Sequence, residues 1–63
     1  MKIKVYFTIR GNTNRPSYTG YVTVCVYRIE DVPTRVYYKL LRSSFPDISK
    51  SDIKINSMEV INR

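Results

Sequence analysis

Lysine, arginine and tyrosine side chains are the groups in this sequence whose type and spacing favour binding chemistry. The first 29 residues contain five cations and no carboxylate, whereas the remainder contains six cations and all five carboxylates. Cationic groups bind phosphates, and tyrosine rings stack on unpaired bases. The N-terminal half therefore indicates a negatively charged partner. The candidate binding residues are Lys2, Lys4, Tyr6, Arg10, Arg15, Tyr21, Tyr27 and Arg28.

The sequence contains few of the residues and motifs that catalysis requires. The sequence contains no histidine to act as a general base or metal ligand, and it has no Gly-rich phosphate loop or nucleophile motif. Its single cysteine, Cys25, is flanked by valines, a setting typical of a small packed side chain and not of a reactive thiol. We therefore expect a non-catalytic protein that uses no cofactor and no metal.

Length and cysteine content bear on stability and location. A chain of 63 residues has room for one domain, predicted to span residues 1–63, and such a domain buries only about 60% of its unfolded surface. Because neither an internal disulfide nor a metal site is expected, a homodimer is the predicted reinforcement. The lone cysteine and the lack of an export signal or membrane-spanning apolar run predict a cytoplasmic protein outside the membrane.

Two strands and a hairpin are predicted in the N-terminal half. Apolar and polar side chains alternate from Ile3 to Ile9 and again over residues 21–29. The intervening residues 11–20 are rich in Gly, Asn, Pro and Ser, so we expect a long hairpin loop. This loop either grips a phosphate backbone or simply connects the strands.

A helix is predicted to follow. Asp31 is the expected N-cap, Pro33 fits the first turn, and Pro46 disfavours helical geometry before it, so the helix should end near Ser44. Apolar side chains at positions 32, 36, 37, 40 and 41 form one stripe. A basic row of Arg35, Lys39 and Arg42 lies on a different side of the helix.

A third strand completes the predicted α+β fold. Apolar and polar residues alternate from residue 53, and a change of phase near Asn56 or Ser57 indicates either a β-bulge or the end of the strand. The order strand, strand, helix, strand predicts a small two-layer domain. A crossover through the helix places strand three parallel to strand two, giving a three-stranded sheet in the order 2-1-3 with one helix on one face.

Two functions remain open for the uncovered face of this sheet. Tyrosines and cations on that face favour nucleic-acid binding, with single strands preferred because their bases are free to stack. The alternative is a small accessory or inhibitory protein, of the kind that viruses and mobile elements encode. In that case the same face contacts an acidic protein surface or a second copy of the chain.

Overall fold

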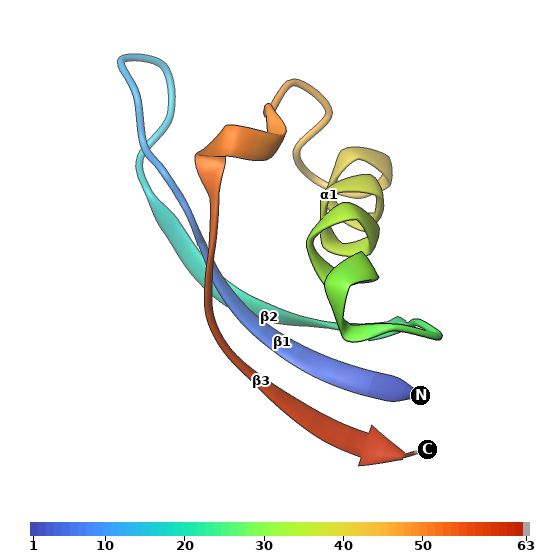
Figure 1. Cartoon of the computed structure of the whole chain (residues 1–63). Helices are drawn as coiled ribbons and strands as arrows, with labels where there is room; N and C mark the ends of the chain where they lie inside the picture. Colours follow the sequence, from blue (N-terminus) through green and yellow to red (C-terminus); the bar gives the residue numbers. More distant parts are fainter. Residues whose placement is uncertain (63) are drawn as a thin grey trace.

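The alternating N-terminal segment forms the central strand of a three-stranded sheet. In the computed structural model, which describes residues 1–62, β1 (Lys2–Ile9) lies between β2 (Tyr18–Cys25) and β3 (Ile53–Asn62). It is antiparallel to both neighbours, so β2 and β3 are parallel to one another. Figure 1 shows β1 and β3 side by side, with the start of β1 and the end of β3 at the same edge of the molecule. The predicted α+β class and the order 2-1-3 are confirmed.

One helix covers one face of the sheet, as predicted (Figure 1). α1 (Val32–Arg42) follows the 3-10 turn η1 (Ile29–Asp31), and a second turn, η2 (Lys50–Asp52), leads into β3. Asp31 is the N-cap residue, but its side chain makes no capping hydrogen bond. Proline occupies the first turn, as the sequence predicted. No helix in the described part of the chain is long and apolar enough to cross a membrane.

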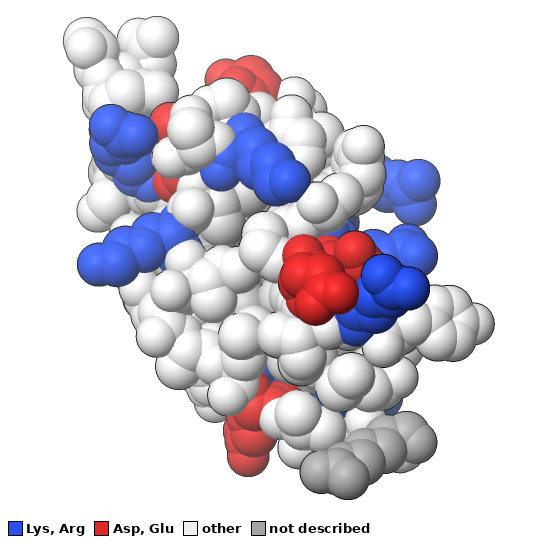
Figure 2. Space-filling model, in the orientation of Figure 1, with Lys and Arg blue, Asp and Glu red and all other residues white. Residues whose placement is uncertain are grey.

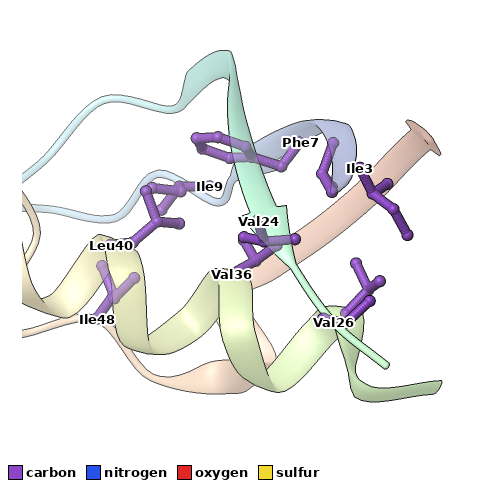
Figure 3. Close-up of a cluster of buried hydrophobic side chains, with 10 residues drawn as sticks. Ile3, Phe7, Ile9, Val24, Val26, Val36, Leu40 and Ile48 are labelled. Carbon is purple, nitrogen blue, oxygen red and sulfur yellow. The ribbon is translucent and has the colours of Figure 1, made fainter. Parts of the chain in front are cut away.

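The core lies between the sheet and α1. Strand side chains alternate between faces, and every second side chain of β1 from Ile3 to Ile9 is buried beneath the helix. Ile48, from the loop before η2, joins this core and was not predicted to do so. Figure 3 shows these side chains converging from the sheet, α1 and that loop. The buried residues are Ile3, Val5, Phe7, Ile9, Val24, Val26, Val32, Val36, Leu40 and Ile48.

The boundaries of β2 differ from those predicted. The strand begins at Tyr18 and ends at Cys25, so residues 18–20 extend the ladder and residues 26–29 lie beyond it. Contacts made by the Tyr18 ring account for the earlier start. Its centroid lies 6.0 Å from that of Phe7 and 5.3 Å from that of Phe45, which brings the ring over the edge of the core.

The remaining hairpin residues form a tight inner turn. Asn12 and Arg15 exchange backbone hydrogen bonds of 2.7 and 3.2 Å, and the Asn12 side chain accepts a bond from the Asn14 N–H. Gly11 is needed for the close approach of the two chains, because a Cβ there would lie 2.6 Å from the Ser17 backbone nitrogen. The loop is therefore a folded turn.

The β-bulge predicted in strand three is present. Phe7 pairs with Ile55 and Tyr6 pairs with Ser57, which leaves Asn56 as the extra residue of β3. The Asn56 side-chain amide donates a 2.9 Å hydrogen bond to the Thr8 hydroxyl on the face opposite the helix. The bulge therefore turns two successive polar side chains toward that open face.

Replacing Leu40 by alanine tests the core. Leu40 is buried, so its truncation should cost about 2–5 kcal/mol of unfolding free energy, a large share of what so small a domain possesses. Urea titration followed by circular dichroism measures the loss. The exposed Arg35→Ala variant on the same helix should change stability by about 0.5 kcal/mol or less. A wild-type midpoint for Leu40→Ala would contradict this core.

Candidate functional site

The open face of the sheet holds a lysine clustered with two tyrosines. Tyr6 of β1 and Tyr21 of β2 are directly opposite in the ladder, and their ring centroids are 6.0 Å apart at an interplanar angle of 49°. The Lys4 ammonium lies 4.3 Å from the Tyr21 centroid and 5.3 Å from the Tyr6 centroid. These distances are typical of cation–π contact. We name Lys4, Tyr6 and Tyr21 the tyrosine cluster.

Lys4 keeps its charge in this setting. Its pKa is raised, first by hydrogen bonding to the Tyr6 side chain and then by the charge interaction with Tyr6, while desolvation opposes the shift. Tyr21 and Glu59 add smaller contributions in the same direction. Tyr21 is 62% exposed. The cluster therefore presents an accessible aromatic surface next to a fixed positive charge.

Strand β3 brings a carboxylate to this face. Glu59 pairs with Lys4 across the ladder, and Lys54 pairs with Thr8. The absence of acidic residues from the first 29 positions did not predict this neighbour, because β3 comes from the far end of the chain. Figure 2 shows acidic side chains interspersed with basic ones on the side of the molecule viewed in Figure 1. The charge asymmetry of the sequence is thus partly cancelled in space.

Two of the candidate cations take part in ion pairs at the hairpin end of the sheet. Arg15 lies 3.5 Å from Asp47 and 3.8 Å from Asp52, and its side chain is only 17% exposed. The Arg10 guanidinium lies 4.0 Å from Asp52. These contacts connect the hairpin to the segment before β3. Arg15 is therefore placed to stabilise the fold, and its charge is partly neutralised, whereas the Arg10 side chain is 71% exposed and its pair is weak.

The last two candidates, Tyr27 and Arg28, lie beyond the end of β2. Tyr27 is 93% exposed, and Arg28 immediately precedes η1. Neither belongs to the sheet face on which they were expected. The structure therefore brings Lys2, Lys4, Tyr6 and Tyr21 together on β1 and β2 and separates the other four candidates from them.

A basic groove lies between α1 and the outer edge of β2. It has a volume of about 870 Å³, and no carboxylate is among the described residues that line it. Its lining comprises Lys2, Thr23, Val24, Cys25, Arg35, Tyr38, Lys39, Arg42 and Ser43. The basic row of the helix was visible in the sequence through its i, i+4, i+7 spacing. Only the packing of α1 shows that this row faces β2.

Lys39 links the groove to the strand edge. Met1 and Val26 exchange main-chain hydrogen bonds of 2.9 and 3.0 Å and so form a hydrogen-bonded pair. In the antiparallel ladder of β1 and β2 that follows, hydrogen-bonded and non-hydrogen-bonded residue pairs alternate. By this alternation, the carbonyl of Thr23 points away from β1. The Lys39 ammonium donates a hydrogen bond to that carbonyl. Lys39 therefore occupies part of the free edge of β2, a known protection against unwanted strand pairing.

Cys25 differs from its expected packed state. Its side chain is free and exposed on the groove side of β2. Among residues 1–62, no group of three or more His, Cys, Asp or Glu side chains is arranged to hold a metal ion.

Comparison with protein-family models, curated protein sequences and solved structures finds no match to this chain. Functional inference therefore relies on the chain's own residues.

The ion pairs around Asp52 predict a pH dependence of stability. Hydrogen bonds from the backbone and hydroxyl of Ser49 lower the pKa of Asp52 most, and Arg10 and Arg15 lower it further. A carboxylate with a lowered folded-state pKa stabilises the fold above its unfolded pKa of about 3.9, and this contribution disappears as pH falls through the folded value. Asp52→Asn should therefore melt below wild type at pH 7, and the two melting temperatures should converge near pH 2.

Thermal melting followed by circular dichroism measures this difference across the pH range. Glu30→Gln is the control, because it removes an exposed carboxylate that lies outside the Ser49–Asp52 capping box. It should show a smaller difference from wild type at pH 7. A gap between Asp52→Asn and wild type that stays constant down to pH 2 would contradict the assignment.

Proposed function

We propose that this chain is a small, basic, non-catalytic protein that binds single-stranded nucleic acid. The tyrosine cluster is the observation that carries the proposal, because it combines an exposed ring with a persistent cation. A base stacked on Tyr21 places its backbone phosphate within reach of the Lys4 ammonium. Stacking of this kind contributes about 1–3 kcal/mol per base.

The geometry favours single strands over duplexes. Tyr21 projects from a sheet face, and a ring in that position stacks only on a base whose own face is accessible. In a duplex the faces of the bases are occupied by their neighbours. Single-stranded loops and ends offer unstacked bases, which is why sheet platforms commonly bind them.

The basic groove supplies phosphate contacts next to the tyrosine cluster. Three residues that line the groove also alternate onto the open face of the sheet: Lys2, Thr23 and Cys25. The basic groove and the open face therefore meet along β2. A strand stacked on Tyr21 can thus pass over this edge and meet the cations of α1. Each phosphate neutralised there releases counterions and makes affinity depend on salt.

A second candidate function is binding to an acidic protein surface. It is supported by Tyr27 and Tyr38, which are 93% and 55% exposed, because exposed tyrosines near arginine are typical of interface hot spots. Arg35 lines a shallow pocket with Tyr27 and another with Tyr38. An aromatic-centred protein interface would resist salt, whereas phosphate contacts would not.

Replacing Tyr21 by alanine should weaken binding to a labelled single-stranded oligonucleotide by about 5- to 150-fold, because one stacking partner is lost. Fluorescence anisotropy measures the dissociation constant. Tyr21→Phe keeps the ring and should bind nearly as well as wild type. Tyr27→Ala is the matched control, since it removes an exposed tyrosine that lies outside the sheet. Equal losses in the Tyr21→Ala and Tyr27→Ala variants would refute the tyrosine cluster as the site.

Removing two groove cations should change the salt dependence of binding. For single strands each phosphate contact contributes about 0.7 to the slope of log affinity against log salt, so Arg35→Gln with Arg42→Gln should flatten that slope by about 1.4. Lys50→Gln, which removes one charge outside the groove lining, should leave it unchanged. Tyr21→Ala should lower affinity without changing the slope. A wild-type slope in the doubly substituted protein would exclude the groove from the site.

A further inference from the structure

The outer edge of β3 combines exposed backbone with exposed apolar side chains. β3 is ten residues long and, within the described chain, pairs on one side only. Met58 and Val60 pair with the buried residues Val5 and Ile3, yet they are 46% and 47% exposed, because α1 packs chiefly over β2. Figure 1 shows the C-terminal half of β3 running away from the helix. Long apolar edges of this kind are templates for pairing with another chain.

Backbone hydrogen bonding determines which residues of β3 face outward. The Arg10 N–H donates a 2.8 Å bond to the Asp52 carbonyl, so even-numbered residues of β1 bond to the third strand. Within residues 53–60 their partners along the ladder are Lys54, Ser57 and Glu59. Apart from the bulge residue Asn56, the other residues of this segment pair with odd-numbered residues of β1 and therefore direct their N–H and C=O groups toward the free edge. They are Ile53, Ile55, Met58 and Val60.

The bulge gives this edge a symmetric side-chain pattern. Asn56 bonds to Thr8 and Ser57 pairs with Tyr6, so both lie on the open face. Along residues 53–60, the side chains at positions 53, 55, 58 and 60 therefore lie on the core face. Those at positions 54, 56, 57 and 59 lie on the open face. This order is the same in both directions. The matching side chains are Ile, Lys, Ile, Asn, Ser, Met, Glu and Val.

We propose that β3 of a second copy of this chain pairs antiparallel with β3, making a homodimer with a continuous six-stranded sheet. In this register Ile53 lies opposite Val60 of the second copy and Ile55 opposite its Met58. Lys54 lies opposite Glu59 of the second copy, and Asn56 opposite its Ser57. The outward-directed backbone groups of Ile53 and Ile55 then meet those of Val60 and Met58.

Two features favour this register: the charges of directly opposite side chains, and the sheet face on which those side chains lie. Directly opposite residues of antiparallel strands share a face, and opposite charges there stabilise the pair while like charges destabilise it. A slide by two residues places Ser57 opposite Met58, or Ile55 opposite Asn56, so that apolar and polar side chains are mismatched. A slide by one residue places core-facing side chains opposite open-facing ones. The proposed register joins like faces throughout and creates two Lys–Glu pairs.

The bulge lies at the axis of the dimer and does not interrupt its regular parts. Bulges usually discourage pairing at an edge. Here Asn56 and Ser57 meet their counterparts at the centre, while residues 53–55 and 58–60 pair on either side. Glu59 also lies opposite Lys4 of its own chain, so it is flanked by lysines from two strands. The proposal is independent of nucleic-acid binding, although the dimer would align two tyrosine clusters on one face.

A charge exchange tests the dimer and its register together. Analytical ultracentrifugation of wild type should give twice the 7.4 kDa chain mass. Lys54→Glu and Glu59→Lys each place like charges opposite one another twice, and each should weaken the dimer by about tenfold to a hundredfold. The Lys54→Glu/Glu59→Lys protein restores opposite charges across the dimer and should regain dimerisation, since the new like-charge contact with Lys4 lies within each chain. Arg28→Glu changes the net charge equally beyond the opposite edge of the sheet and should remain dimeric.

Hydrogen exchange supplies a second readout in folded protein. The amides of Ile55 and Met58 should be protected in wild type and should exchange faster in Lys54→Glu, whereas the amide of Val5, which lies in the central strand, should stay protected in both. Circular dichroism confirms that each variant is folded. A wild type that remains monomeric at about 1 mM, or a double variant no more dimeric than Lys54→Glu, would overturn the proposal.

Discussion

The side chains of β1 that face the helix, from Ile3 to Ile9, are almost completely removed from water, and the placement of every other element follows from their burial. Full burial of such a side chain is worth about 1.5–3 kcal/mol. A single strand has no means of covering its own apolar face. β2 and β3 pair with the backbone of β1 on either side and widen its apolar face, and Val36 and Leu40 of α1 join the core that covers that face. In so small a domain these contacts leave little stability to spare.

One helix is too narrow to cover three strands equally. An α-helix with its side chains is about 10–12 Å wide, and neighbouring strands are about 4.8 Å apart. Because α1 packs chiefly over β2, its basic row comes to lie beside the β2 edge, where Lys39 bonds to Thr23. The same displacement leaves Met58 and Val60 half exposed on β3. The basic groove and the uncovered edge thus share one structural cause.

Local contacts decide how the net charge of +6 is distributed over the surface. The carboxylate of Asp52 attracts Arg10 and Arg15 at the hairpin end, and Glu59 lies beside Lys4 on the open face. By contrast, no carboxylate is among the described residues that line the groove, and Asp31 shares only a neighbouring pocket with Arg35. The carboxylate-free basic surface therefore lies partly on the helix, and positive charge is not spread evenly over the N-terminal half.

The sequence alone determined the fold class, because alternation in β1 and the apolar stripe of the helix are local patterns that only one simple packing satisfies. It also marked a change of phase near Asn56, and the pairing of β1 with β3 decided that this is a bulge and not the end of the strand. Tertiary structure decided the start of β2, since Tyr18 pairs with Ile9 and its ring packs near Phe7 and Phe45, which are distant in sequence. It likewise decided where the cations lie, because contacts between segments distant in sequence pair Arg15 with Asp47 and gather Lys2 with the basic row of α1.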